Sequence, residues 1–195
     1  YEQVIRRREG LLAHLGPLVV RTGYHTGRSP NDKFIVREPE SEKNIWWGKV
    51  NKGMSAECAE RLYFKMMAYI QGKDLYVEDC YASADEKHKI GIRVVTENAW
   101  HTLFARNMFR RYTTDEELSK HRTDFTIIQM PNFHADREVD CTNSEVFILL
   151  NFTKRIVLIG GTSYAGEIKK SVFTIMNYLM PLRGVMSMHC SANVG

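Results

Sequence analysis

A glycine-rich turn that leads into a helix is the first feature of this sequence that could support chemistry. Gly160, Gly161 and Gly166 surround Tyr164 within the stretch 158–166. Glycine lets the backbone come close to a ligand, so the N–H groups of such a turn can bind an anion at the start of the following helix. The turn therefore predicts a site for an anionic group.

Two consecutive lysines, Lys169 and Lys170, follow in the first part of the helix. A cation is disfavoured near a helix N-terminus, because the backbone dipoles already place positive charge there. The pair therefore suggests that an anionic group or a strong ligand field compensates for the two charges. The alternative is an ordinary pair of solvated lysines, and the residues alone leave both interpretations open.

Beyond the helix, an apolar segment leads to His189. Val185, Met186 and Met188 precede His189 and Cys190, and this pattern predicts a short buried strand. A histidine at a strand end is more often a hydrogen-bonded structural residue than a metal ligand. Its interest lies in its combination with the turn and the two lysines.

Arg28 lies in a second informative stretch, Thr22–Val36, where glycines and a proline shape a loop between two strand-like runs. Its guanidinium offers a planar fork of donors that suits a carboxylate or a phosphate. An arginine in a polar loop is by default exposed to solvent, and Ser29 followed by Pro30 could equally be the start of a helix. The loop is therefore a candidate anion-binding element.

The elements that must position these residues mix strands and helices without strict alternation. Helices are predicted at residues 2–15, 55–71, from Thr96 onward, and from Ala165 until Pro181 stops the run. Strands are predicted at residues 18–20, 75–77, 90–94, 125–130, 146–152 and 155–159. This order predicts an α/β protein in which helices pack on a mixed sheet.

Composition narrows the classes of function. The chain has 195 residues, of which 44% are hydrophobic, and a net charge of +4 in which 27 basic residues are interleaved with 23 acidic ones. This predicts a globular protein that binds neither nucleic acid nor membrane, and no signal peptide or membrane span is evident. The four cysteines show neither close pairing nor metal-binding spacing, so we expect reduced thiols and a cytoplasmic protein.

Several segments resemble the ATP-dependent phosphoenolpyruvate carboxykinases: TGYHTGRSPNDKFIV, NSEVFILLNFTKR, GGTSYAGEIKK, MNYLMPLRG and SMHCSANVG. The resemblance implies that residues 1–183 form the N-terminal substrate-binding domain and that residues 184–195 are the first strand of a truncated nucleotide-binding domain. In that family, a phosphate-binding loop of the form G-x-x-x-x-G-K-[ST] soon follows the SMHCSANVG strand. No such loop occurs within the 195 residues.

The resemblance also implies a reaction and its residues. A carboxy-lyase of this family converts oxaloacetate and ATP into phosphoenolpyruvate, CO2 and ADP in gluconeogenesis. Arg28 would grip the substrate carboxylate, and Tyr164 would orient the carboxyl group that leaves as CO2. Lys170 would contact the substrate and, together with His189, bind manganese, while Lys169 would add positive potential near the phosphates. Magnesium would arrive with ATP. A lysine can bind a metal only as the neutral amine.

Two interpretations from other classes remain beside the enzyme. The chain could be a non-catalytic anion-binding module derived from that enzyme, and we expect no turnover from residues 1–195 alone, because phosphoryl transfer needs the phosphate-binding loop. A nucleic-acid binder would rest on the pI of 8.8 alone and would need steep salt dependence of binding.

Overall fold

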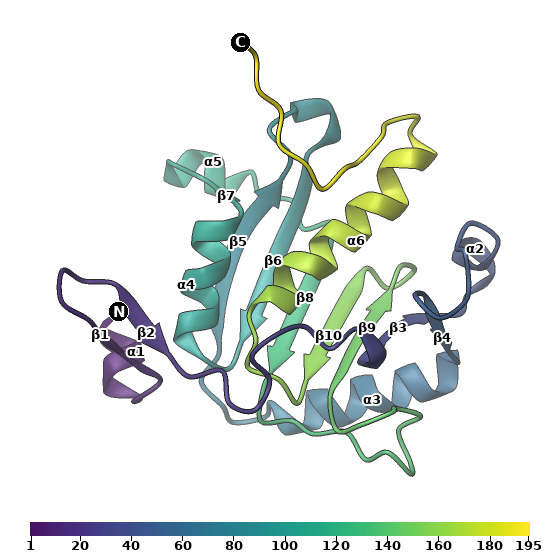
Figure 1. Cartoon of the computed structure of the whole chain (residues 1–195), viewed down its shortest axis with the longest axis horizontal. Helices are drawn as coiled ribbons and strands as arrows, with labels where there is room; N and C mark the ends of the chain where they lie inside the picture. The colour runs from purple at the N-terminus through teal and green to yellow at the C-terminus, as the bar shows by residue number, and fades with distance from the viewer.

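A mixed sheet of eight strands organises the computed structural model, which describes all residues from 1 to 195 (Figure 1). The strand order is β4-β3-β9-β10-β8-β6-β5-β7, and both parallel and antiparallel pairs occur. The strands are β3 (Lys33–Val36), β4 (Lys52–Met54), β5 (Tyr76–Ala82), β6 (Ile90–Thr96), β7 (Arg110–Arg111), β8 (Phe125–Met130), β9 (Phe147–Asn151) and β10 (Ile156–Gly160). The prediction of an α/β fold with a mixed sheet is confirmed.

The central strands are buried on both faces. Their sequences, FTIIQM, FILLN and IVLIG, are almost continuously apolar, as expected when helices or loops cover both sides of a sheet. Alternate residues divide between two hydrophobic clusters. Ile148 and Ile159 pack with residues of the last helix, whereas Leu149 and Leu158 pack with residues of a helix on the other face.

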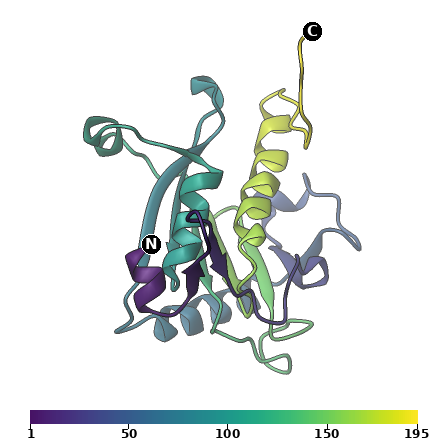
Figure 2. The same cartoon turned by 60° about the vertical axis from the view of Figure 1, so that its left-hand side comes forward.

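Three long helices cover the sheet, α3 (Ala56–Tyr69), α4 (Ala99–Met108) and α6 (Gly166–Leu182). Figures 1 and 2 show α4 and α6 on one side of the sheet and α3 on the other. Short helices are α1 (Glu2–Arg6), α2 (Pro39–Glu42) and α5 (Asp115–Ser119), and 3-10 turns lie at Pro30–Asp32 and Glu86–His88. No helix combines the length and the apolar character that crossing a membrane requires.

The predicted helix over residues 2–15 is wrong beyond Arg6. Strand β1 (Gly10–Leu12) instead pairs with β2 (Leu18–Val20) in an antiparallel hairpin beside the main sheet. Leu15 and Gly16 both have positive φ in the connecting turn, so the chain reverses here rather than continuing a helix. The pairing partner thus overrides the local helical pattern.

The predicted buried strand at residues 185–190 is also wrong. Helix α6 includes Pro181 in its last turn and ends at Leu182, and residues 184–195 form no strand. Figure 1 shows this segment running away from the sheet. A strand needs a neighbour that accepts its backbone hydrogen bonds, and no strand of the structure pairs with this segment. Met186 and Met188 are consequently exposed.

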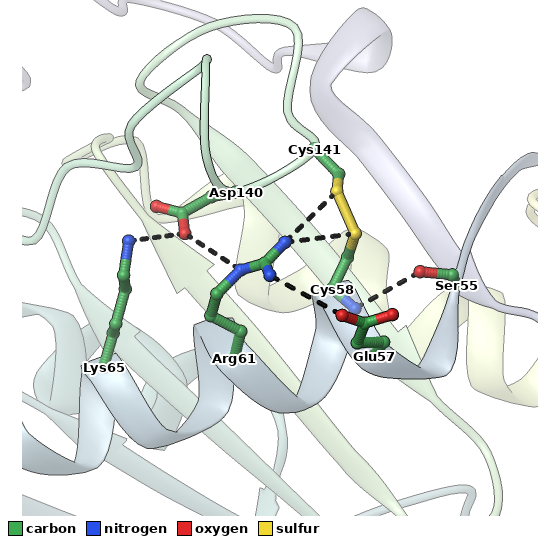
Figure 3. The surroundings of a disulfide bond; sticks show 7 residues. All are labelled: Ser55, Glu57, Cys58, Arg61, Lys65, Asp140 and Cys141. Atoms are coloured by element: carbon green, nitrogen blue, oxygen red, sulfur yellow. Dashed lines mark hydrogen bonds and ion pairs between the residues drawn. A yellow bond between two sulfur atoms is a disulfide. The ribbon is translucent and has the colours of Figure 1, made fainter.

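The expectation of four reduced thiols is wrong for one pair, because Cys58 and Cys141 form a disulfide (Figure 3). Cys58 lies in the first turn of α3, and Cys141 lies in the loop between β8 and β9. They are 83 residues apart in sequence but 6.1 Å apart at Cα, so linear spacing could not reveal the pair. Cys80 is buried and free, and burial raises the pKa of its thiol to about 12. Cys190 is exposed and free.

Candidate functional site

A cleft of about 600 Å³ separates the Arg28 loop from helix α6. We use the name Arg28 loop for residues 22–32, which connect β2 to β3. Arg28 and Ser29 line one wall, while Glu167, Lys170 and Phe173 line the wall formed by α6. The structure thus brings together two of the predicted site residues, Arg28 and Lys170, from segments far apart in the sequence.

Helix α6 presents Lys170 to the cleft because its opposite side is buried. Ile168, Val172 and Ile175 belong to the core and lie on the side that faces the sheet. The Nζ atom of Lys170 lies 5.0 Å from the centroid of the Phe173 ring, which is a cation–π distance. Lys169 is half-buried but does not line the cleft. The two lysines therefore do not share one environment.

His189 approaches the same aromatic ring from the exposed segment after α6. The centroid of its imidazole lies 5.5 Å from that of Phe173 in an edge-to-face arrangement. His189 is exposed and does not line the cleft. Lys170 and His189, the two predicted metal ligands, thus both contact Phe173, and each carries a nitrogen that can bind a metal in its neutral form.

Tyr164 lies in a turn that buried side chains hold in place. Gln129 Nε2 donates to the carbonyl of Thr162 over 3.1 Å, and His101 Nε2 donates to the carbonyl of Ser163 over 2.8 Å. The Tyr164 ring covers Gly166, where an added Cβ would lie 2.4 Å from Tyr164 Cε1. Tyr164 is half-buried and does not line the cleft. It lies just before the N-terminus of α6.

Two glycines of this turn, Gly160 and Gly161, pack closely against other parts of the chain. A Cβ at Gly160 would lie 2.4 Å from the ring of Phe147, and one at Gly161 would lie 2.6 Å from the carbonyl oxygen of Glu145. Gly161 also has φ of +72°. Both glycines are buried, so a larger side chain would not fit at either position, and anion binding by the turn stays a prediction.

His101, whose imidazole donates to the Ser163 carbonyl, is fully buried. Burial lowers the pKa of His101 to about 4, so the imidazole is neutral at pH 7. Its Nε2 carries the proton, because the Ser163 carbonyl can only accept, and Nδ1 has no partner. A neutral imidazole therefore fixes the start of the turn that carries Tyr164.

Two hydrogen-bonded contacts join the Arg28 loop and β3 to α6. The backbone N–H of Ser29 donates to Glu167 Oε1 over 2.6 Å. Lys33 Nζ donates to Thr174 Oγ1 over 2.7 Å, and this hydroxyl donates to the Lys170 carbonyl over 2.9 Å. The sequence analysis missed Glu167, Lys33 and Thr174. Helical spacing was the available signal, because residues 167 and 174 lie on the same face as Lys170.

Sequence comparisons show the family to which the chain belongs. The family model described as phosphoenolpyruvate carboxykinase matches residues 1–195. The chain belongs to the phosphoenolpyruvate carboxykinase family. It is 62% identical to the phosphoenolpyruvate carboxykinase (ATP) of Geobacter sp. (strain M21), 59% to that of Geotalea uraniireducens (strain Rf4) and 56% to that of Thermus thermophilus. Each match covers the whole chain and 37% of the relative.

Within this phosphoenolpyruvate carboxykinase family member, the donors for a metal are few. No group of three or more histidine, cysteine, aspartate or glutamate side chains is placed to hold an ion. Lys170 and His189 both lie near the Phe173 ring, and each has a nitrogen that could serve as a metal ligand, so their role as ligands stays a prediction. Two ligands form only part of a coordination shell.

Proposed function

We propose that this chain supplies the substrate-binding part of an ATP-dependent phosphoenolpyruvate carboxykinase. That enzyme would convert oxaloacetate and ATP into phosphoenolpyruvate, CO2 and ADP. The observation that carries the proposal is the cleft in which Arg28 and Lys170 face the same space, in a chain of this family. Two cationic side chains around one cleft suit a dianionic substrate.

The roles of the residues follow from the charge that the reaction moves. Loss of CO2 leaves electrons on an enolate oxygen, and fixed positive charge lowers the energy of that state. Arg28 would hold the substrate carboxylate through its two parallel donors. Tyr164 would orient the departing carboxyl group through its hydroxyl, and Lys170 would contact the substrate. Lys169 would add positive potential near the phosphates.

The metal part of the proposal concerns Lys170 and His189. These residues would hold Mn²⁺ through the neutral amine and the neutral imidazole, and Mg²⁺ would accompany ATP. When bound, the metal would stabilise negative charge on the substrate oxygen. Lys170 must release its proton for this role, so metal uptake would release protons.

The division of labour within the longer enzyme is part of the same proposal. Residues 1–183 would form the substrate-binding domain, because the packed body ends with α6 at Leu182. Residues 184–195 would begin the nucleotide-binding domain, whose strands would cover Met186 and Met188. A cytoplasmic location and a role in gluconeogenesis accompany the proposal. The Cys58–Cys141 pair would then meet a reducing thiol pool.

A chimera tests this proposal. Residues 1–195 would replace the matching part of the Geobacter sp. (strain M21) relative, with the unmodified relative as the control for the assay. We expect the chimera to form phosphoenolpyruvate from oxaloacetate and ATP. Arg28→Lys keeps the charge but loses the fork, so it should raise KM for oxaloacetate and lower the rate at a cost of about 1.5–3 kcal/mol.

Affinity for ATP should barely change in Arg28→Lys. A folded chimera without activity would contradict the proposed function. A defect confined to ATP would place Arg28 on the nucleotide side.

A further inference from the structure

The Arg28 side chain makes no hydrogen bond or ion pair of its own, although it is the predicted grip for the substrate. No protein group binds its guanidinium, and the residue is exposed. Its position therefore depends on how its backbone is held. The nearest hydrogen bond is one residue away, where the N–H of Ser29 donates to Glu167.

Glu167 is a buried acidic residue, as are Glu97 and Asp140. Only 5% of the residue is exposed, and it lies in the cleft wall beside Lys170. Burying a carboxylate is unfavourable unless hydrogen bonds and opposite charges compensate. The Ser29 N–H supplies one such hydrogen bond, and Arg28 and Lys33 supply positive charge nearby.

The contacts of α6 with the opposite wall lie on both sides of Lys170. Glu167 precedes Lys170 by three residues and Thr174 follows it by four, so all three lie on one helix face. Glu167 holds Ser29, and Thr174 holds Lys33 at the start of β3. Lys170 thus lies between the two residues of α6, Glu167 and Thr174, that hydrogen-bond to the opposite wall of the cleft.

The Arg28 loop is also fastened from its outer side. Asn143 Nδ2 donates to the carbonyl of Asn31 over 2.6 Å, and Ser144 Oγ donates to Asp32 over 2.9 Å. These contacts hold the turn after Ser29, and the bond to Glu167 is the one that directs the residue next to Arg28 toward α6.

We propose that Glu167 is a positioning residue, whose carboxylate holds the backbone of Ser29 and so fixes the distance at which the Arg28 backbone lies from Lys170 across the cleft. This inference rests on the proposed function, because the distance matters only if both side chains bind one substrate. Small errors in the placement of binding groups strongly reduce the rate of an enzyme. Glu167 touches no reacting atom in this role.

The acceptor oxygen, rather than the charge, is the essential part of Glu167. Glu167→Gln retains a carbonyl oxygen at the same chain length and should keep the bond to Ser29. Glu167→Ala removes the acceptor and should release the Arg28 loop. The matched control is Glu116→Gln, which changes an exposed glutamate of α5 far from the cleft.

Nuclear magnetic resonance on the chain 1–195 tests the contact without any enzyme assay. The Ser29 amide proton should exchange with solvent slowly in the wild-type chain, in Glu167→Gln and in Glu116→Gln. In Glu167→Ala it should exchange at least ten times faster, while amides of the central strands stay protected. Equal exchange in the wild-type chain and Glu167→Ala would overturn the inference.

Kinetics in the chimera test the positioning role. Glu167→Ala should raise KM for oxaloacetate at least ten-fold and leave KM for ATP within about two-fold, whereas Glu167→Gln should stay within about three-fold for both. An inactive wild-type chimera would contradict the proposed function. An active chimera in which Glu167→Ala leaves KM for oxaloacetate unchanged would overturn the positioning role alone.

Discussion

The turn before α6 and the segment after it differ in how the protein holds them. Residues 160–165 are fixed by buried donors, among them Gln129 and His101, and Gly160 and Gly161 pack against Phe147 and Glu145. Residues 184–195 are mostly exposed, although Val185 packs against the larger hydrophobic cluster, and beyond Val185 two neighbouring pairs contact the body. Ser187 is hydrogen-bonded to Asn177, and His189 contacts Phe173.

This difference separates the two kinds of predicted site residue. The structure itself orients Tyr164 and Lys170, which belong to the braced turn and to a packed helix. His189 lies on a segment that the sheet does not hold. If the proposed function holds, the predicted substrate-binding residues Tyr164 and Lys170 are held more firmly than the predicted metal ligand His189.

The largest effect should follow from changing Lys170, which lies near the same Phe173 ring as His189. Arginine cannot supply a neutral amine, and methionine offers only a thioether to a metal that prefers nitrogen and oxygen. Lys170→Arg and Lys170→Met should each weaken manganese binding by the chimera at least ten-fold, and His189→Ala should do the same. Electron paramagnetic resonance measures the free manganese, and circular dichroism controls for folding.

Unchanged manganese affinity in well-folded Lys170 variants would remove the metal assignment. Lys169 and Lys170 would then be solvated charges on a helix.

Breaking the disulfide should loosen the braced turn and leave the exposed segment as it is. The loop that holds Cys141 continues to Glu145, whose carbonyl packs against Gly161. Cys58→Ser should lower the free energy of unfolding by about 2–4 kcal/mol, chiefly because the unfolded chain gains freedom. Urea unfolding of the chain measures the loss, and Cys190→Ser is the matched control, which should be neutral. Equal stability of the wild-type chain and Cys58→Ser would contradict a tether at this place.

The buried base of the braced turn makes stability depend on pH. The pKa of His101 is about 4 in the folded chain and about 6.5 when unfolded, so between these values only the unfolded state binds the proton. The contribution of the neutral His101 to the free energy of unfolding is fully present above pH 6.5. This contribution should fall by about 3 kcal/mol as the pH drops to 4. His101→Gln, which can still donate to Ser163, should lack this part of the pH dependence.

Urea unfolding at several pH values compares the two chains. Parallel pH profiles for the wild-type chain and His101→Gln would show that His101 does not titrate in this way.

The smallest effect should come from His189 in the isolated chain. Because the side chain is exposed, His189→Ala should change the free energy of unfolding by less than about 0.5 kcal/mol. Urea unfolding gives the comparison, and a loss above about 1 kcal/mol would mean that the exposed segment is held more firmly than the contact with Phe173 suggests.

Sequence patterns predicted the parts of the fold that local periodicity determines. The helical spacing of apolar residues located α3 and α6, and the apolar runs located β8, β9 and β10. Strand β2 was predicted at residues 18–20, but its partner β1 and the unpaired state of segment 184–195 escaped prediction, because a strand depends on its partner. The Cys58–Cys141 bond escaped for the same reason, since it joins distant segments.

The site residues also divide into those that sequence motifs identify and those that only contacts between distant segments reveal. Family motifs identified Arg28 and Lys170, and the structure brings both to one cleft. Glu167 and Lys33 carry no motif that separates them from surface charges. Their importance lies in contacts with Ser29 and Thr174 across more than a hundred residues of sequence, which only the folded chain reveals.

The most direct measurement is a titration of the isotope-labelled chain 1–195 with phosphoenolpyruvate, followed by nuclear magnetic resonance. We expect saturable shifts in the amide signals of Ser29 and Lys170 and in the Arg28 side chain, because the proposed function places the anionic substrate in the cleft between the Arg28 loop and α6. Arg28→Lys should weaken this binding. Absent saturation, or shifts gathered on another basic surface such as Arg110 and Arg111 of β7, would contradict the assignment of the cleft.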